Sequence, residues 1–338
     1  MLTGSCKAMR VCIVGGTGNI STSIVTLLLE QGHDVTCFNR RRQGEVPDGA
    51  RVIEGDRLER DSFEKAMQQE AFDAAIDMIC FNREDALSDI KAFQGVAHFI
   101  QVSTVCTYGV DYDRLPVDED HPLRPTTDYG HNKVAADSAF LEAHGRRGFP
   151  VSIVKPSTTY GPKMGLLRQV AWDFSWLNRI LEGRPILIGG DGHIIHQFLH
   201  VDDAALCFTH MLGRDSCIGQ TYNMVREGFT SWRCYHETAM RVLGRTVEMF
   251  GVNCRDLAQL GVPSYEVCRD IFAYNCYYNA EKLFRDVPEF RPRISLEDGM
   301  QRVVNSMQHD RCIPISEPGG WEDRIIDCVR SMRVRSEV

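Results

Sequence analysis

The sequence has no long apolar run and no excess of positive charge. None of its apolar segments approaches the ~18 residues that a transmembrane helix needs, and the first eight residues, MLTGSCKA, lack the apolar core of a signal peptide. Lys and Arg number 38 against 46 Asp and Glu, which gives a net charge of -8. This balance argues against a general affinity for nucleic acid or for anionic membranes. We therefore expect a cytoplasmic protein with a small-molecule substrate and a flexible N-terminal tail at residues 1–8.

Patterns typical of metal sites and disulfides are also missing. The chain has 13 cysteines, but none forms a Cys-x-x-Cys pair and none groups with histidines at the spacing of metal ligands. Cys12, Cys37 and Cys207 lie within apolar runs, where a thiol behaves as a small buried hydrophobic group. We expect neither a metal site nor disulfides, and reduced thiols fit the cytoplasm.

The first half of the chain alternates apolar strand patterns with helical patterns. At 338 residues the chain can form one large domain or two coupled ones. The alternation predicts an α/β fold, a doubly wound parallel sheet covered on both faces, with ligands beyond the carboxyl ends of the strands. The expected strands are 10–14, 34–38, 51–54, 74–78, 98–102 and 151–155, and the expected helices are 20–31, 61–69, 83–93 and 132–143. After Gly161 the alternation fades, and helices are expected over 169–181 and from Val201 onward.

A glycine-rich turn follows the first expected strand. The strand runs directly into Gly15-Gly16-Thr17-Gly18 and then into a helix. Glycines allow a sharp turn and a close approach to a pyrophosphate, while N–H groups at the helix start attract phosphate charge. Ser21 stands where the third glycine of a Gly-x-x-Gly-x-x-Gly pattern is expected, which alters the contact between helix and strand. The turn predicts a dinucleotide site, with an ordinary strand-turn-helix as the alternative.

Tyr129, Lys133 and Thr104 are the catalytic candidates. Tyr129 and Lys133 stand four residues apart on one face of an expected helix, and Thr104 follows the strand at 98–102. We expect the Lys133 ammonium to lower the pKa of the Tyr129 phenol, so that tyrosinate accepts a proton from a carbinol whose oxygen Thr104 holds. Hydride then passes to a nicotinamide. A second Tyr-x-x-x-Lys, Tyr278 to Lys282, has no preceding strand that ends in Ser or Thr, and we interpret it as the start of a surface helix.

Together these motifs resemble the extended short-chain dehydrogenases/reductases, and most of all the NAD-dependent epimerase/dehydratase family with its atypical members. The resemblance covers about residues 9–285 in the same order. It implies a Rossmann-type fold, a bound NAD or NADP, a sugar-like substrate oxidised at a secondary alcohol, and a homodimer. The motifs are Gly15-Gly16-Thr17-Gly18-Asn19-Ile20, Gly55-Asp56, Ser103-Thr104 with Tyr108-Gly109, Tyr129-x-x-x-Lys133, Tyr160-Gly161-Pro162 and Phe198-Leu199-His200-Val201-Asp202-Asp203.

The residues after Thr104 depart from the dehydratase pattern of this superfamily. Sugar-nucleotide 4,6-dehydratases carry an Asp-Glu pair there, and decarboxylases usually hold Glu at the second position. This chain has Val105-Cys106, and valine cannot protonate a leaving hydroxyl. In GDP-mannose 3,5-epimerase, a similar family member, a cysteine at the position of Cys106 acts as acid/base, which implies the same role here if the pKa of the thiol is lowered. A buried thiol that fills a gap is the alternative.

The end of the second strand bears on the choice of cofactor. Asn39 stands where NAD-preferring members of the family place an Asp for the ribose hydroxyls, so the carboxylate that repels a 2′-phosphate is missing. Arg40, Arg41 and Arg42 follow and suit a phosphate, which favours NADP, with an exposed basic turn as the alternative. By resemblance, the predicted cofactor contacts are Gly15, Thr17, Gly18, Asn19, Ile20, Asn39, Arg40, Asp56 beside the adenine, Arg57 and Lys133.

The substrate side matches the family less well. Members that act on nucleotide sugars often carry Asn where Thr158 stands, and typically Arg where this chain has His196. Lys163, or Arg168 in its place, is the candidate partner of Cys106. Because a diphosphate needs cations or N–H donors, their loss implies a substrate without one, such as a free sugar, a glycoside or a cyclitol, or a different clamp.

We predict an epimerase that acts on a sugar or sugar derivative through a transient ketone. The alternatives are an NADP-dependent sugar dehydrogenase or ketoreductase, and a non-catalytic member of the fold that binds nucleotides or RNA. Residues 9–165, with 195–215 packing back onto them, are expected to form the NAD(P)-binding domain. Residues 166–194 and 216–338 are expected to form a smaller substrate-binding lobe.

Overall fold

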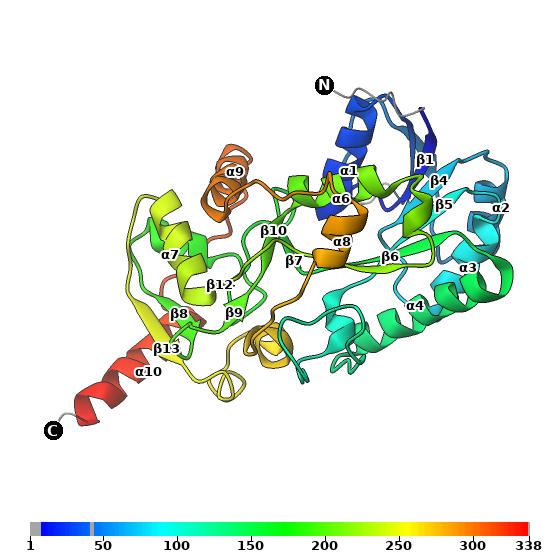
Figure 1. Cartoon of the computed structure of the whole chain (residues 1–338). Coiled ribbons are helices and arrows are strands. Elements are labelled where there is room, and N and C mark those ends of the chain that lie inside the picture. Colours follow the sequence, from blue (N-terminus) through cyan, green and yellow to red (C-terminus); the bar gives the residue numbers. More distant parts are fainter. Residues whose placement is uncertain (1–7, 41–43, 337–338) are drawn as a thin grey trace. The chain divides into compact units, whose positions relative to one another are not determined.

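The chain divides into two compact units, drawn together in Figure 1. The computed structural model describes residues 8–40 and 44–336. The predicted tail, except for Ala8, and the predicted phosphate ligands Arg41 and Arg42 therefore lie outside the described residues. Unit 1 comprises Met1–Thr159, Val201–Glu227 and Tyr278–Pro292, and unit 2 comprises Tyr160–His200, Gly228–Tyr277 and Arg293–Val338.

Unit 1 is built on a seven-stranded sheet in the order β11-β6-β5-β4-β1-β2-β3, in which every neighbouring pair is parallel. The central strands are buried along nearly their whole length, as a parallel sheet covered on both faces requires. The predicted doubly wound sheet is confirmed. Its strands are β1 (Arg10–Val14), β2 (Asp34–Asn39), β3 (Arg51–Glu54), β4 (Ala74–Asp77), β5 (His98–Val102), β6 (Val151–Pro156) and β11 (Thr221–Met224).

The helices of unit 1 form two groups. α1 packs against α6, and α3 packs against both α2 and α4. Between the second group and the sheet, Phe99 of β5 lies 5.4 Å from Phe93 and 5.1 Å from Phe140, measured between ring centroids. The helices are α1 (Asn19–Glu30), α2 (Arg60–Gln68), α3 (Arg83–Ala92), α4 (Asp128–Arg147), α6 (Val201–Met211) and α8 (Glu281–Asp286), with 3-10 turns η1 (Val105–Tyr108) and η2 (Asp215–Cys217).

The strand order places a crevice at the ends of β1 and β4. From β1 the chain continues to β2 and β3 on one side, and then crosses to β4, β5 and β6 on the other side. The connections that follow β1 and β4 therefore diverge, which opens space beyond their carboxyl ends. Gly15 follows β1 and Ile79 follows β4, so the glycine-rich turn lies at this position.

Unit 2 contains smaller sheets and its own apolar core. β8 and β13 pair in parallel, β9 and β12 pair antiparallel, and α7 packs against α9. Trp176 and Trp232 are fully buried in this core. Its elements are β7 (Thr158–Tyr160, which begins in unit 1), α5 (Trp176–Leu181), β8 (Ile186–Gly189), β9 (Ile195–His196), β10 (Phe198–His200), β12 (Thr230–Ser231), α7 (Trp232–Val242), β13 (Met249–Val252), a π-helical turn η3 (Cys268–Phe272), α9 (Leu296–His309) and α10 (Trp321–Ser336).

The helix predicted over 169–181 is wrong in its first half, because only α5 is helical there. Gln169 and Asp173 use their side chains in contacts that replace helical hydrogen bonds. Gln169 Oε1 accepts from Gly189 N at 2.9 Å, and Asp173 Oδ1 accepts from Ser175 Oγ at 2.8 Å. These bonds hold the segment in an irregular conformation up to the start of α5.

The predicted domain boundaries also differ from the structure. Residues 216–227, expected in the substrate lobe, belong to unit 1, because β11 is the seventh strand and pairs with β6. Residues 278–292 belong to unit 1 as well, where α8 packs against β11. Conversely, residues 160–165 and 195–200 fall in unit 2. β11 was not recognised because, unlike the four-residue strands β3 and β4, it lies outside the strand-helix alternation of the first half of the chain.

The described residues hold 12 cysteines, all of them free thiols, and seven of these are buried. No helix in the described part of the chain is both long and apolar enough to cross a membrane. Within the same residues, no group of three or more His, Cys, Asp or Glu side chains is placed to hold a metal ion.

Candidate active site

The turn after β1 depends on glycine at two positions. Gly15 has a φ of +88°, and a Cβ atom added to it would lie 2.8 Å from Ile79 Cγ2. A Cβ atom on Gly16 would lie 2.5 Å from the sulfur of Cys37. The first position therefore needs a left-handed backbone and the second needs the absence of a side chain. Both keep the backbone of the turn close to the ends of β2 and β4.

Two side chains hold the N–H groups of this turn. Asn39 Oδ1 accepts from Gly16 N at 2.9 Å, and Ser21 Oγ accepts from Gly18 N at 2.8 Å. Ser21 is buried, so the residue that replaces the third glycine closes the first turn of α1 with its hydroxyl. The Asn39 Nδ2 atom and both polar side-chain atoms of Asn19 are buried without a hydrogen-bond partner among the described residues.

A pocket of about 270 Å³ opens beside the turn, at the carboxyl ends of β1, β2 and β4. The predicted cofactor residues Gly15, Thr17, Gly18, Asn39, Arg40, Asp56 and Arg57 all line it, together with Phe38, Gly55, Leu58, Ile79, Phe81 and Asp85. Asn19 and Ile20 begin α1 directly after the turn. The glycine backbone and the unpartnered amide of Asn39 in this wall fit a nicotinamide dinucleotide.

The basic residues of the pocket are already paired. Arg40 lies 3.7 Å from Asp56 in an ion pair in which its side chain stays half exposed. Arg57 is buried and donates to the carboxylates of Asp77 and Asp89 and to the carbonyl oxygen of Asp85. The prediction that Arg57 binds the cofactor is corrected as follows. Arg57 lines the pocket, but its charge is neutralised by carboxylates and is not available to a ligand.

The start of α4 brings Tyr129 to Thr104. Thr127 caps the helix, and its Oγ1 accepts from Gly130 N at 3.0 Å. A Cβ atom on Gly130 would lie 2.8 Å from the carbonyl oxygen of Cys106, so the helix start contacts η1 closely. Across this contact the Thr104 side chain lies near the Tyr129 hydroxyl and acts to lower the pKa of that phenol, against the larger effect of burial, which raises it. The structure thus brings together two residues that lie 25 positions apart.

Lys133 is buried one turn further along α4. Its Nζ donates to the carbonyl oxygens of Val102 at 2.6 Å and Cys80 at 2.8 Å, and lies 5.8 Å from the centroid of the Tyr129 ring. The expected lowering of the Tyr129 pKa by Lys133 is not found. Burial of the hydroxyl raises the pKa of Tyr129, although its ring is 44% exposed, and the Thr104 side chain acts in the opposite direction.

Cys106 lies in η1, two residues after Thr104. Its backbone N donates to Thr104 Oγ1 at 3.2 Å. Burial raises the pKa of the Cys106 thiol, and the side-chain hydrogen bond to Thr104 lowers it by less. The lowered pKa that a general base requires is therefore not present, and the thiol form can only donate a proton.

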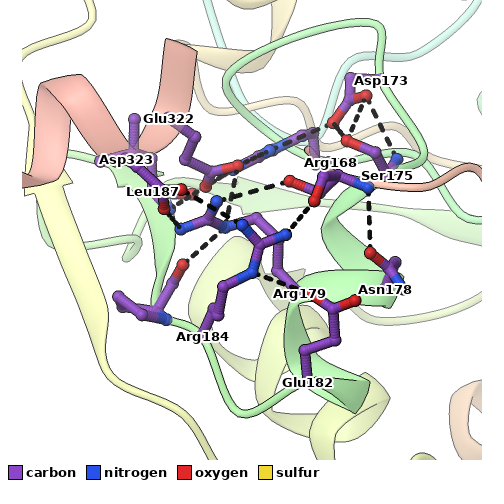
Figure 2. A network of polar contacts seen from close by, with 12 residues as sticks. Arg168, Asp173, Ser175, Asn178, Arg179, Glu182, Arg184, Leu187, Glu322 and Asp323 are labelled. Carbon is purple, nitrogen blue, oxygen red and sulfur yellow. Dashed lines mark hydrogen bonds and ion pairs between the residues drawn. The ribbon is translucent and has the colours of Figure 1, made fainter. Parts of the chain in front are cut away.

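Two of the predicted substrate residues are corrected by the structure. Figure 2 shows the buried network around Arg168, whose guanidinium donates to Glu322 of α10, at 2.7 Å to Oε2, and to Asp173 at 3.2 Å. Arg168 is 0% exposed, and it tethers α10 within unit 2 beside the ion pair of Arg179 with Asp323. Its charge is neutralised by carboxylates, so Arg168 is a structural residue.

His196 is also a core residue of unit 2. Its ring lies 5.3 Å from the ring centroids of both Trp232 and Phe272, and burial lowers its pKa to about 3. A neutral, buried imidazole cannot replace the Arg that grips a diphosphate. Thr158 is half-buried in β7 and Lys163 is exposed in the turn that follows, and both stay predictions.

The late Tyr-x-x-x-Lys does stand at a helix start, that of α8, but its tyrosine is not on the surface. Tyr278 precedes α8 and is buried, with its hydroxyl 2.9 Å from that of Tyr112. Lys282 Nζ lies 5.2 Å from the centroid of the Tyr222 ring. Both residues belong to the packing of unit 1 around β11 and α8.

Sequence reasoning missed two buried charges beside Thr104. Asp137 of α4 and Lys155 of β6 form an ion pair at 3.0 Å. Two signals in the sequence could have found them. Asp137 continues the face of Tyr129 and Lys133 at the same four-residue spacing, and Lys155 is a charge at the end of an otherwise apolar strand.

The comparisons with known proteins agree with this geometry. The chain is 28% identical over 238 residues to a 2'-dehydrokanamycin reductase from Streptomyces kanamyceticus, which covers 70% of this chain and 67% of that protein. It is 31% identical over 241 residues to a UDP-glucose 4-epimerase from Corynebacterium glutamicum, which covers 62% of this chain and 71% of that protein. Both matches span about two thirds of the relative's length.

A solved structure gives the same fold. The chain superposes on a UDP-glucose 4-epimerase from Stenotrophomonas maltophila, with bound NAD and formylated UDP-arabinopyranose, with a TM-score of 0.74 at 17% identity, covering 90% of this chain and 99% of that one. The predicted enzyme of the extended short-chain dehydrogenase/reductase type is confirmed. The model of the NAD dependent epimerase/dehydratase family matches residues 11–86 and 83–224, and the chain belongs to this family.

Proposed function

We propose that this protein is an NAD(P)-dependent epimerase that acts on a sugar or sugar derivative through a transient ketone. The observation that carries the proposal is the contact of Tyr129 with Thr104 at the end of β5, in the same unit as the glycine-lined pocket. A phenol and a threonine hydroxyl at one point can hold and deprotonate a single carbinol oxygen.

Each of the three residues has a separate role in this proposal. Thr104 holds the carbinol oxygen, and Tyr129 accepts its proton as the ketone forms and returns it when the alcohol is restored. Burial raises the pKa of the Tyr129 phenol, so this role requires a nearby positive charge, which a bound oxidised nicotinamide would supply, to lower it. Two of the three N–H donors of the Lys133 ammonium bind main-chain oxygens, which fixes the cation below the Tyr129 ring. The glycine turn, Asn39 and Asp56 would hold the dinucleotide, which would supply the acceptor and donor of the hydride.

We propose that inversion occurs at the oxidised carbon itself. Return of the hydride to the other face of the ketone needs no further base, whereas enolisation at a neighbouring carbon does. Because the pKa of Cys106 is raised, its proposed role is that of a proton donor and not of a base. This assignment agrees with the absence of a carboxylate at Val105 and Cys106.

The proposed substrate is a sugar or glycoside without a nucleotide diphosphate. His196, which stands where members that act on nucleotide sugars place the diphosphate-binding Arg, is a neutral core residue. The named substrate of the reductase relative, a kanamycin derivative, fits this proposal.

We propose NADP as the preferred cofactor. Asn39 offers a neutral amide where a carboxylate would repel a 2′-phosphate, and Arg40 has only a loose, half-exposed partner in Asp56. We also propose a cytoplasmic location, because the described cysteines are free thiols, and a homodimer as the resemblance implies.

A net ketoreductase is the second candidate, favoured by the similarity to the kanamycin-related reductase. Denaturing the purified protein and identifying the released nucleotide by mass tests retention of the cofactor, which an epimerase requires. Candidate sugars and glycosides are then supplied, and the products and the absorbance of reduced nicotinamide are followed. Sustained net production or consumption of the reduced cofactor would replace the epimerase by the reductase.

A Tyr129→Phe variant separates the enzyme from a binding protein. The enzyme should lose most of its rate, because the phenol that accepts the proton is removed. A biological activity that the variant retains in full would indicate a non-catalytic nucleotide- or RNA-binding member of the fold.

A further inference from the structure

A buried ion pair lies directly behind the candidate catalytic residues of unit 1. Asp137 follows Tyr129 and Lys133 on the same face of α4, and it is 4% exposed. Its Oδ2 accepts from Ser103 Oγ at 2.6 Å and from Lys155 Nζ at 3.0 Å. Lys155, at the end of β6, is 3% exposed. The pair thus joins α4 and β6 to the residue next to Thr104.

A continuous chain of hydrogen bonds leads from this pair to Thr104. Lys155 Nζ donates to Thr107 Oγ1 at 2.7 Å, and Thr107 Oγ1 donates to the carbonyl oxygen of Thr104 at 2.9 Å. An ammonium can only donate, so it fixes the direction of the Thr107 hydroxyl. The ion pair therefore sets the position of η1, the turn that carries Thr104 toward Tyr129.

We propose that Asp137 and Lys155 are positioning residues for hydride transfer. They hold Thr104 in place beside Tyr129, and they neutralise each other's charge beneath the site. The proposal rests on the proposed function. A buried ion pair contributes little net stability compared with apolar side chains of similar volume. The main effect of the Asp137–Lys155 pair is therefore expected on the position of the residues that it contacts.

The charges near Tyr129 allow the effects of Asp137 and Lys155 to be told apart. Thr104 and Cys106 of η1 face its hydroxyl, and Lys133 and Asp137 lie on its own helix. Burial raises the pKa of Tyr129 and lowers that of Lys133, and the Asp137 carboxylate acts to raise both. Loss of Asp137 leaves a bare cation under the site, and loss of Lys155 leaves a bare carboxylate.

The test compares Asp137→Asn, Lys155→Met and the double variant. We expect each single variant to lower kcat by about tenfold or more with little change in KM, because the alignment of Thr104 is lost. The pH at which activity rises should move down by about one unit in Asp137→Asn and up by about one unit in Lys155→Met, following the sign of the remaining charge. The double variant, which is neutral, should return toward the wild-type pH profile.

Glu322→Gln is the matched control, since it breaks an equally buried ion pair, with Arg168 in unit 2. It should lower the melting temperature without moving the pH profile. If Lys155→Met does not fold, Asp137→Asn and the double variant still carry the comparison. Single variants that are destabilised like the control, but keep the wild-type pH profile, would reduce the pair to a structural role and overturn the proposal.

A direct titration of Tyr129 separates this proposal from the proposed function. Fluorotyrosine, which ionises at lower pH than tyrosine, is incorporated at all 10 tyrosines, and the Tyr129→Phe spectrum identifies the resonance of Tyr129 by fluorine NMR. The titration needs no substrate. Opposite shifts of this resonance's midpoint in the two single variants support the pair even if no sugar is turned over, and identical midpoints in all variants overturn it.

Discussion

Replacing Gly130 by alanine should separate Tyr129 from Thr104 without removing either residue. The new Cβ atom would lie 2.8 Å from the carbonyl oxygen of Cys106 and 2.9 Å from Cβ of Pro125, closer than real Cβ atoms come. Overpacking of this kind costs about 1–3 kcal/mol, because the helix start and η1 must move apart. Alanine regains about 0.5–1 kcal/mol of backbone entropy in a helix. The net expected loss of stability is about 1–2 kcal/mol.

The larger effect should be on catalysis. A displacement of a few tenths of an ångström up to about 1 Å between catalytic groups can lower a rate by up to about 100-fold. Gly145→Ala is the control on the same helix, since a Cβ atom there meets nothing within 4 Å and should stabilise the protein. Urea unfolding measures the stability of both variants, and steady-state kinetics measure kcat. A Gly130→Ala enzyme as stable and as active as the Gly145→Ala enzyme would refute the close contact of α4 with η1.

Three further predictions concern unit 1. Arg57→Met should destabilise the protein by about 3–5 kcal/mol in urea unfolding, because the Asp77 carboxylate stays buried and loses its ion pair; a loss under about 1 kcal/mol would contradict this. Burial lowers the pKa of His98 to about 4. As the pH falls from about 6.5 to about 4, the unfolded state takes up a proton that the folded state does not, so the stability of the protein should fall. In melting curves measured over this pH range, His98→Gln should make that fall smaller. Asn39→Asp keeps the acceptor for Gly16 N but adds a charge, and should weaken NADP binding relative to NAD by about tenfold or more in titration calorimetry; an unchanged ratio would remove Asn39 from cofactor choice.

Patterns along the chain predicted the sheet and its ligand crevice. Strand-helix alternation is a local property, so β1 to β6 were found within one or two residues of their observed ends. The seventh strand, Thr221–Met224, was missed because it lies beyond the region of strand-helix alternation and is defined by its pairing with β6. Its partner lies about 70 residues earlier in the chain. Pairing over such a distance leaves no trace in a local pattern.

The candidate site was predictable where one residue type serves one geometric need. The backbone at position 15 has a positive φ, which requires glycine. Tyr129 and Lys133 lie on the same face of their helix because they are four residues apart. The predictions made for charged residues were less accurate. Arg57 was predicted by resemblance to contact the cofactor, and Arg168 was predicted as a possible partner of Cys106, yet both are buried among carboxylates. A sequence shows the charge of a side chain but not its partner, and the partner decides whether that charge is available to a ligand.

The two positions after Thr104 limit the chemistry that the site can perform. Val105 is buried in η1, and the Cys106 thiol beside it has a raised pKa, so neither side chain supplies a base at neutral pH. Elimination of water requires both an acid and a base next to the ketone, whereas in the proposed function oxidation and reduction of a carbinol require only the proton that Tyr129 accepts and returns beside Thr104. A site with the second set and without the first can form a ketone and reduce it again. This restriction favours epimerisation or ketone reduction over dehydration, and it follows from residues that are absent from the site as much as from those that are present.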